Sequence, residues 1–388
     1  MKILMLSDVY FPRVNGVSTS IQTFRRELQR LGHEIWVVAP EYGQPAEEED
    51  GISRVPSRRV LFDPEDRMMR PGPLDRRLRA LDGGRFDLVH VQTPFVAHYA
   101  GLRLARRWSV PCVETYHTFF EEYLFHYLPV LPKNAWRAVA RLFSRRQCNR
   151  LDGLVVPSRA MREALERYGV RAAMRVIPTG MPQDAFREGD GQAFRARHGI
   201  AASQPTLVFV GRVAFEKNIE FLLDVVRALK QTRHPDIVLI VAGEGPAEGR
   251  LHRLAGELGV RDNLRFVGYL ARGADLASCY RAGDVFVFAS RTETQGLVLL
   301  EAMSLGVPVV STAVMGTRDI LEAGKGALVA AEEVADFAAQ VRRLLDDAAL
   351  RRRLGQEGRE YARHWAADGP AQALLAFYEQ IRAGRAPV

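Results

Sequence analysis

The chain has few cysteines and no long hydrophobic run, and each absence excludes a class of protein. Its 388 residues include 3 cysteines, Cys112, Cys148 and Cys279, which lie far apart. They form neither a disulfide-rich framework nor a C-x-x-C metal site, so we expect reduced thiols in a reducing compartment. No run approaches the roughly 18 apolar residues of a transmembrane helix, and the first residues lack the pattern of a signal peptide. The sequence therefore predicts a soluble, cytoplasmic protein.

Composition and charge narrow the class further. With 47% hydrophobic and 26% charged residues, the chain is typical of a folded globular protein, and its length favours two domains. The formal net charge is +8. This balance favours anionic partners, which include nucleic acid, an acidic membrane surface and phosphorylated ligands.

Short apolar runs alternate with helix-length segments along the chain. We expect a helix at 17–31, ending at Gly32. Continuous apolar strands separated by helices are typical of parallel sheets covered on both faces. The polar, glycine-rich stretch 187–205 interrupts the alternation, and we interpret it as a linker. The expected strands are 2–7, 34–40, 88–92, 110–115, 153–158, 174–180, 206–212, 237–243, 264–269, 284–290 and 307–312.

This pattern predicts an α/β protein with two Rossmann-like, doubly wound domains that face each other across a cleft. Ligands of such sheets bind at the carboxyl ends of the strands, so loops at those ends are the candidate sites. The loop "SDVYFPRVNGVSTS" (7–20) joins the first strand to the first helix, and Gly16 and Val17 open that helix toward a ligand phosphate. It is not a G-x-G-x-x-G fingerprint, which disfavours a dehydrogenase.

The stretch "TETQGLVLLEAMSLG" (292–306) places one acid in a strand-end loop and another in the following helix. Gly296 allows close backbone approach, and the free N–H groups of Leu297 and Val298 suit a diphosphate. Glu293 lies in the loop, and Glu301 lies about one turn into the helix, where it can accept hydrogen bonds from ribose hydroxyls. Taken alone, both acids are equally compatible with a solvated surface.

A second stretch, "GRVAFEKN" (211–218), strengthens the ligand interpretation. It places Arg212 and Lys217 after the first strand of the second half, just before a helix. Two fixed cations there would neutralise a diphosphate and stabilise it as a leaving group. The sequence contains no D-x-D, so nothing calls for a divalent metal that holds the diphosphate.

These residues resemble the family 4 glycosyltransferases of the GT-B fold. The resemblance rests on "GRVAFEKN", "VAGEGP", "NLRFVGYL", the Glu293-x7-Glu301 spacing and "GVPVV", which occur in the order seen in this family. It implies a retaining hexosyltransferase that uses a UDP- or GDP-linked sugar as co-substrate, with no bound metal and no other cofactor. It also implies an acceptor-binding domain, 1–186, completed by a helix at 366–388, and a nucleotide-sugar-binding domain, 187–365.

The resemblance implies a role for each candidate residue. Glu293 would contact the hexose and Glu301 the ribose. The diphosphate would bind Arg212 and Lys217, and the base would be bordered by Gly268 and Tyr269. Two departures leave the donor open, since Gln295 stands where an aromatic residue is common and "VMGT" (314–317) where two glycines are common.

The acceptor side is expected in the first half. His117 follows a strand and looks like the histidine that this family places beside the transferred sugar, so it completes a catalytic set with Glu293, Arg212 and Lys217. The run "ETYHTFFEEYLFHYLPVLP" (114–132) is similar to bacterial and plastid glycolipid synthases. It suggests contacts between a lipid acceptor and Tyr116, Tyr123 and His126.

A basic segment at 132–150 follows this run. Lys133, Arg137, Arg141 and Arg145 recur every four residues, which on a helix forms one stripe beside apolar residues. This pattern suits the surface of an anionic bilayer, although an ordinary helix that packs on its domain would show a similar pattern. We therefore expect a cytoplasmic protein, peripheral on the inner face of the cytoplasmic membrane.

Two alternatives remain at the level of sequence. The same chemistry could act on a soluble sugar or a growing lipopolysaccharide. A protein of another class, a basic nucleic-acid-binding protein, is disfavoured because no nucleic-acid module motif appears. We therefore expect a nucleotide sugar and a lipid as partners, and no nucleic acid.

Overall fold

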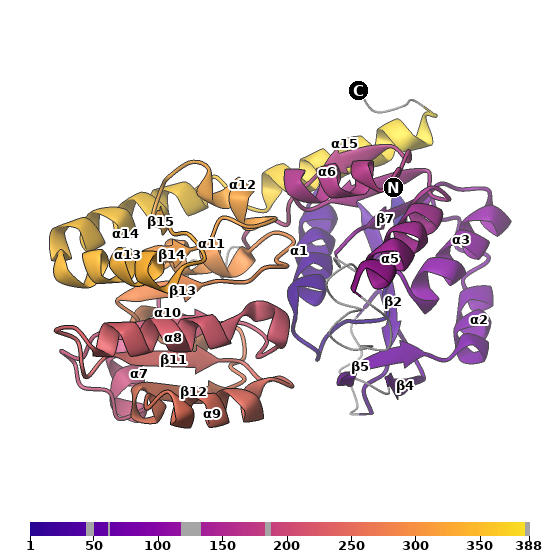
Figure 1. The fold of residues 1–388 in the computed structure, drawn as a ribbon. Coiled ribbons are helices and arrows are strands. Elements are labelled where there is room, and N and C mark those ends of the chain that lie inside the picture. Colours follow the sequence, from indigo (N-terminus) through magenta and orange to yellow (C-terminus); the bar gives the residue numbers. More distant parts are fainter. Residues whose placement is uncertain (44–49, 61–62, 118–132, 183–187, 385–388) are drawn as a thin grey trace. The chain divides into compact units, whose positions relative to one another are not determined.

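The computed structural model describes residues 1–43, 50–60, 63–117, 133–182 and 188–384. The chain forms two compact units, which we call unit 1 (Met1–Gly180 with Ala367–Val388) and unit 2 (Met181–Ala366) (Figure 1). The sequence analysis set the corresponding boundaries after residues 186 and 365. The two-unit division leaves the amino-terminal and carboxyl-terminal segments of the chain in the same unit.

Unit 1 contains a parallel sheet in the order β3-β2-β1-β6-β7-β8-β9. Its central strands are almost entirely buried, because helices cover them and most of their side chains are apolar. A separate antiparallel hairpin, β4–β5, follows β3. The strands are β1 (Lys2–Leu6), β2 (Glu34–Pro40), β3 (Ile52–Val55), β4 (Ser57–Val60), β5 (Asp63–Met69), β6 (Leu88–Val91), β7 (Cys112–Thr115), β8 (Gly153–Val156) and β9 (Met174–Val176).

The helices of unit 1 begin and end at recognisable residues. For α1, the Asn15 side chain caps the start by accepting from the Ser18 N–H at 2.9 Å, and Gly32 follows the end with φ +83°. The helices described in this unit are α1 (Gly16–Arg30), α2 (Pro71–Ala80), α3 (Val96–Trp108), α5 (Lys133–Cys148), α6 (Arg159–Arg167) and α15 (Asp368–Arg382).

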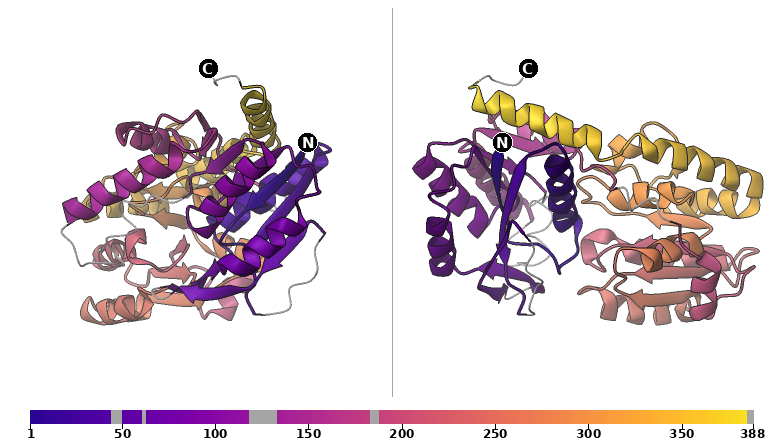
Figure 2. Two further views of the ribbon diagram at one scale, coloured as in Figure 1. Left: turned by 90° about the vertical axis from the view of Figure 1, so that its right-hand side faces the viewer. Right: turned by 180° about the vertical axis from the view of Figure 1, so that it is seen from behind.

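The last helix, α15, belongs to the core of unit 1. Its Leu374, Phe377 and Tyr378 are buried in one cluster with Ile21 and Phe24 of α1. The Tyr378 hydroxyl also lies 2.6 Å from Nδ1 of His90 in β6. Figure 2 shows α15, in yellow, running along the indigo and purple elements of this unit.

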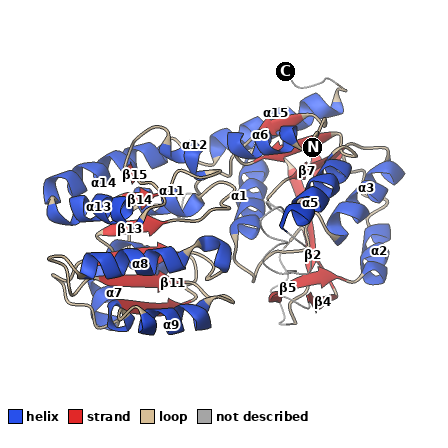
Figure 3. Cartoon of the chain, viewed as in Figure 1, coloured by secondary structure: helices blue, strands red, loops and turns tan. Residues whose placement is uncertain are grey.

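Unit 2 contains a second parallel sheet in the order β12-β11-β10-β13-β14-β15. Helices lie on both faces of this sheet, which is the doubly wound arrangement that the sequence predicts (Figure 3). The strands are β10 (Thr206–Val210), β11 (Val238–Ala242), β12 (Leu264–Gly268), β13 (Val285–Phe288), β14 (Val309–Ser311) and β15 (Ala327–Val329).

The helices of unit 2 are α7 (Gly191–Arg197), α8 (Ile219–Lys230), α9 (Glu248–Glu257), α10 (Ala274–Ala282), α11 (Leu297–Ser304), α12 (Thr317–Leu321), α13 (Val334–Asp346) and α14 (Ala348–Arg363), with short 3₁₀ helices η2 (Phe215–Lys217) and η3 (Arg261–Asn263). Helices α8 to α12 connect these strands by crossovers, α7 precedes the first strand, and α13 and α14 follow the last. Within this unit, α8 packs beside α9 and α13, and α10 packs beside α7.

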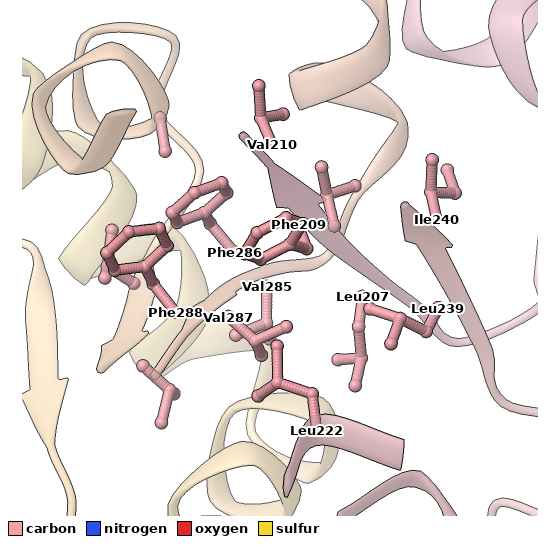
Figure 4. Packing of buried hydrophobic residues seen from close by; sticks show 14 of the residues in the cluster. Leu207, Phe209, Val210, Leu222, Leu239, Ile240, Val285, Phe286, Val287 and Phe288 are labelled. Atoms are coloured by element: carbon pink, nitrogen blue, oxygen red, sulfur yellow. The ribbon is translucent and has the colours of Figure 1, made fainter. Parts of the chain in front are cut away.

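Three phenylalanines form the centre of the unit 2 core (Figure 4). The rings of Phe209 and Phe288 stack with centroids 5.9 Å apart, and those of Phe286 and Phe288 lie 6.1 Å apart. All three side chains are at most 1% exposed. Burying one such ring contributes roughly 1.5–3 kcal/mol, so this core fixes β10 and β13 firmly against each other.

The prediction of a linker at 187–205 is wrong. Residues 191–197 form α7, which begins where the Asp190 side chain accepts from the Ala193 N–H at 2.9 Å. Phe194 is 1% exposed, and the Arg195 guanidinium lies 3.0 Å from Asp284. One buried ring and one largely buried ion pair therefore attach this polar segment to unit 2. The predicted strands and the first helix are confirmed, with ends that differ by a few residues.

Candidate functional site

The candidate site in unit 2 lies where the strand order reverses. The chain moves from β10 outward to β12, then returns to β13 on the other side of β10 and continues to β15. The loops after β10 and β13 therefore diverge at the carboxyl edge of the sheet, the place where open sheets of this kind bind ligands, and we call this place the crevice. The first loop carries Arg212 and Lys217, and the second carries Glu293, as the sequence predicts.

Lys217 and Glu293 form an ion pair at this crevice. The Lys217 Nζ lies 2.7 Å from Glu293 Oε2, and the two side chains are 18% and 20% exposed. The ammonium group also lies 6.0 Å from the centre of the Phe288 ring. Arg212 is half-buried in the loop directly after β10. The site therefore presents fixed charges that are close to solvent, which suits recognition of a charged, polar ligand.

Glycines allow the loops after β10 and β11 to meet. Gly243 has φ +132°, and a Cβ there would lie 2.0 Å from the Gly211 carbonyl oxygen. The Gly243 N–H donates to the carbonyl of Gly268 at 2.8 Å, and Tyr269 beyond it is 48% exposed. Glu244 accepts from the Tyr269 N–H at 3.3 Å, so the "VAGEGP" loop supports the segment that we expect to border a base.

The start of α11 presents backbone donors. Gly296 has φ +98°, and within the described part of the chain no side chain caps the helix. The N–H groups of Leu297 and Val298 thus begin a helix without a side-chain acceptor, an arrangement that favours anions. Gln295, just before the glycine, is buried, and the carbonyl of Glu293 accepts from the Gly316 N–H at 2.9 Å.

Glu301 has two partners that the sequence analysis missed. Its Oε1 accepts from Arg272 Nη2 and its Oε2 from the Tyr280 hydroxyl, each at 2.7 Å. Arg272 precedes α10 and Tyr280 lies on α10. The packing of α10 in unit 2 brings these groups to α11, and no spacing in the sequence shows that contact.

His117 lies beyond β7 in unit 1 and is held by a neighbour on the adjacent strand. Its Nε2 lies 3.1 Å from Oε1 of Gln92, which directly follows β6. An amide oxygen only accepts, so Nε2 carries the proton and Nδ1 the lone pair. Burial lowers the pKa of His117 to about 4, so the ring is neutral near pH 7. The sequence analysis missed Gln92, although the pairing of two strand ends could have suggested it.

The strand reversal of unit 1 lies between β1 and β6, and a hydrogen-bond network links the two loops there. Asp8 Oδ2 accepts from the Thr93 hydroxyl and from the Ala97 N–H, both at 2.9 Å. Burial raises the pKa of Asp8 to about 6. Further along the same loop, Gly16 is exposed, and a Cβ at this position would meet no atom within 4 Å, while Val17 is half-buried.

The predicted acceptor residues divide into two groups. Tyr116 is 3% exposed, and its hydroxyl lies 2.7 Å from Ser144 Oγ on α5, so it attaches that helix to the end of β7. Tyr123 and His126 lie outside the described residues. The acceptor contacts of all three remain predictions.

The basic segment forms α5, and its described residues present two different faces. Ala140, Ser144, Gln147 and Cys148 are buried against unit 1. The other face carries Val139 and Leu142, which are 48% and 47% exposed, together with exposed arginines at 141, 145 and 146. In the described chain, no helix is long and apolar enough to cross a bilayer. No cluster of three metal-ligating side chains occurs among the same residues.

Comparisons with known proteins agree on one family. Residues 14–184 match the model described as Glycosyltransferase Family 4, and residues 190–361 match that described as Glycosyl transferases group 1. The alpha-monoglucosyldiacylglycerol synthase of Streptococcus pneumoniae is 32% identical over 321 residues, which cover 80% of this chain and 71% of that protein. The GDP-mannose-dependent alpha-mannosyltransferase of Mycobacterium tuberculosis is 31% identical, over 83% and 81% of the two chains. The solved sucrose-phosphate synthase of Thermosynechococcus elongatus shares the fold, with a TM-score of 0.79, 22% identity and coverage of 99% and 100%.

Proposed function

The chain belongs to glycosyltransferase family 4 and has the GT-B fold, and we propose that it transfers a hexose from a nucleoside diphosphate sugar to a membrane lipid with retention of configuration. The observation that carries the donor half of this proposal is the crevice in unit 2. There, Lys217 and Glu293 lie 2.7 Å apart beside the uncapped start of α11.

Each group of the crevice has a chemical role in the proposal. Arg212, Lys217 and the first N–H groups of α11 bind the diphosphate and stabilise the charge that develops on it as it leaves. Glu293 accepts hydrogen bonds from hydroxyls of the hexose, and Lys217 holds its carboxylate in place. These groups are fixed by the loops after β10 and β13, so little reorganisation is needed when the bond breaks.

In the proposed reaction, the acceptor hydroxyl attacks the anomeric carbon on the face from which the diphosphate leaves. A bond forms between acceptor oxygen and anomeric carbon, the bond between that carbon and the phosphate oxygen breaks, and a phosphate oxygen of the departing nucleotide takes up the hydroxyl proton. The neutral His117 orients the reacting groups or stabilises charge. Arg212 and Lys217 supply the positive charge of the site, so we propose that no metal is required.

A lipid acceptor is supported by a relative and by α5. The relative from S. pneumoniae is named as a synthase of a glucosyldiacylglycerol, which suggests diacylglycerol or a glycolipid as acceptor. The exposed Val139 and Leu142 of α5, with arginines beside them, suit insertion at the surface of an anionic bilayer. We therefore propose a protein that is peripheral on the inner face of the cytoplasmic membrane and does not act on nucleic acid.

The first experiment offers radiolabelled UDP- and GDP-sugars with extracted membrane lipids, with and without EDTA. Label in the lipid phase, unchanged by EDTA and with an α-linkage after transfer from an α-linked donor, is the expected result. Label that enters only a soluble sugar or lipopolysaccharide would keep the glycosyltransferase and overturn the lipid acceptor. Loss of transfer in EDTA, restored by Mg²⁺, would overturn the metal-free proposal.

A vesicle-binding assay tests α5 separately. The double variant Val139→Ser and Leu142→Ser should bind vesicles rich in phosphatidylglycerol roughly tenfold more weakly than the unmodified protein, because apolar area is lost from the interface. The control is Leu31→Ser, since Leu31 is also an exposed apolar residue of unit 1, at 41%. Equal binding by the double variant and the control would exclude α5 as the membrane contact.

A further inference from the structure

The environment of Glu301 is unusual for a carboxylate that is expected to bind a ligand. The side chain is 10% exposed, and each of its oxygens already accepts one hydrogen bond, from Arg272 on one side and Tyr280 on the other. A buried carboxylate is costly unless it is paired and hydrogen-bonded. The two partners therefore explain how unit 2 tolerates a charged group at this depth.

The two partners act differently on Glu301. Arg272 supplies a full positive charge, and its side chain is 28% exposed. Tyr280 is 1% exposed and supplies a neutral donor from the body of α10. Burial and the negative charge of Glu301 raise the pKa of Tyr280 well above its usual value, so the hydroxyl remains protonated and donates.

Glu301 retains capacity for a ligand. A carboxylate offers about four acceptor positions, two on each oxygen, and the two described partners use one on each. One further position thus remains on each oxygen, which matches the number of donors in a pair of neighbouring hydroxyls. A small, open hollow of about 30 Å³ borders the group, lined by Arg272, Tyr280 and Glu301 with Leu276, Ala277 and Leu305.

We propose that Arg272 and Tyr280 are positioning residues that fix the orientation of the Glu301 carboxylate, so that its unused acceptor positions receive the 2′- and 3′-hydroxyls of a ribose. This inference rests on the proposed function, which supplies a ribonucleotide donor. It adds a source of selectivity that Glu301 does not provide alone, because an untethered carboxylate could rotate away from the two hydroxyls. The site should consequently select ribonucleotides over deoxyribonucleotides through residues that do not touch the sugar.

The experiment measures binding of UDP and GDP, and of their 2′-deoxy counterparts, to the full chain by titration calorimetry. The proteins compared are the unmodified chain, Arg272→Met and Tyr280→Phe. Arg233→Met is the matched control, because Arg233 pairs with Asp346 in the same unit, away from the residues of the site. Thermal unfolding of each variant verifies the fold.

The unmodified protein should bind the preferred ribonucleotide roughly tenfold more tightly than its 2′-deoxy form, since hydrogen bonds to a charged acceptor are lost. In Arg272→Met and Tyr280→Phe, this ratio should fall below about threefold, while the control keeps it. In transfer assays, the same variants should raise KM for the donor and leave kcat within about twofold, because the ribose is remote from the reacting carbon.

The outcomes separate this inference from the function on which it rests. Full discrimination in folded Arg272→Met and Tyr280→Phe would overturn the positioning roles. If Arg272→Met does not fold, Tyr280→Phe alone decides, because it removes a hydroxyl and leaves the ion pair. Equal binding of both nucleotide forms by the unmodified protein would overturn the contact between Glu301 and the ribose. Failure to bind any of the four nucleotides would instead overturn the proposed donor.

Discussion

The two units are both built on a parallel sheet, but they differ in the charge of the groups near the carboxyl edges of those sheets. In unit 2, two ion pairs lie there, Lys217 with Glu293, each about one-fifth exposed, and Arg272 with the more deeply buried Glu301. In unit 1, two imidazoles on adjacent strands are neutral near pH 7, since burial lowers the pKa of His90 to about 3 and that of His117 to about 4. One edge is thus built to meet a charged ligand and the other to hold uncharged polar groups.

In the proposed reaction, this difference would divide the tasks between the units. A diphosphate needs fixed positive charge, and Arg212 and Lys217 would supply it from the loops of unit 2. An acceptor hydroxyl is itself neutral, and a neutral imidazole beside it can orient it without a competing charge. The contrast makes predictions for each unit, of which the largest concerns unit 2.

Replacing Glu293 with Gln should lower kcat roughly 100- to 1,000-fold, because the variant loses the charge that binds and orients the hexose. The amide oxygen can still accept from Lys217, so the fold should be retained. Transfer from the preferred donor to lipid, measured beside circular dichroism, tests this. Asp346→Asn, which removes a carboxylate from another ion pair of the same unit, should leave the rate unchanged. Full activity in Glu293→Gln would remove the carboxylate from the mechanism.

Unit 1 should lose stability in acid because of its buried imidazoles. The unfolded chain has the ordinary histidine pKa of 6.5, whereas folding lowers that of His90 to about 3. The contribution of His90 is therefore fully present above pH 6.5 and is lost as the pH falls toward 3. Between pH 7 and pH 4.5 the loss amounts to roughly 2 kcal/mol.

The variant His90→Gln should show less of this loss, measured by urea unfolding at the two pH values. Asp8 acts in the opposite direction, because its raised pKa favours the native state as the pH falls below about 6. The quantity to compare is therefore the loss in the free energy of unfolding between the two pH values, in the variant and in the unmodified protein. His364→Gln, at an exposed position of unit 2, should not alter the pH dependence. Identical acid sensitivity in His90→Gln would show that His90 is not the cause.

A substitution at Gln92 should favour the protonated form of His117. In Gln92→Glu, a carboxylate 3.1 Å from Nε2 replaces the amide and should raise the pKa of His117 by roughly 1–3 units. The transfer rate at pH 6, divided by that at pH 8, should then be several-fold lower in this variant than in the unmodified protein, whose rate should differ little between the two pH values. Gln380→Glu adds the same charge on α15, away from His117, as the control. A flat profile in Gln92→Glu would mean that the charge of His117 does not affect transfer.

The smallest expected effect concerns backbone strain beside the donor site. Met315, in the "VMGT" segment, has φ +53°, a left-handed conformation that costs a residue with a Cβ about 1 kcal/mol or more. Met315→Gly should raise the free energy of unfolding by a few tenths to about 1 kcal/mol, since the greater freedom of glycine when unfolded offsets part of the gain. Met315→Ala retains the Cβ and should gain nothing. An equal gain in both variants would assign the effect to the side chain instead of the backbone.

Much of the fold, and part of the site in unit 2, could be predicted from the sequence. The strands are continuous apolar runs, and their alternation with helices predicts two doubly wound sheets. Lys217 and Glu293 each follow such a run, so their meeting required only that β10 and β13 be neighbours. The resemblance to a known family implied the GT-B fold and a role for each residue.

The contacts that were not predicted depend on how helices and strands pack against one another. Arg272 lies 29 residues before its partner Glu301, and only the seating of α10 in unit 2 brings them together. Gln92 lies on a different strand end from His117. The segment around α7 is polar and glycine-rich, and it folds because Phe194 is buried and Arg195 finds Asp284. Each of these contacts is long-range, so local pattern could not reveal it.

The return of α15 to unit 1 has a consequence for the order in which the protein is completed during synthesis. Unit 2 ends at residue 366, and its first and last residues, Met181 and Ala366, are joined by an isolated parallel β-bridge. Unit 1, although begun first, lacks Leu374, Phe377 and Tyr378 until the final helix emerges. The half that is translated first therefore cannot complete its core until α15 has been made, after the whole of unit 2.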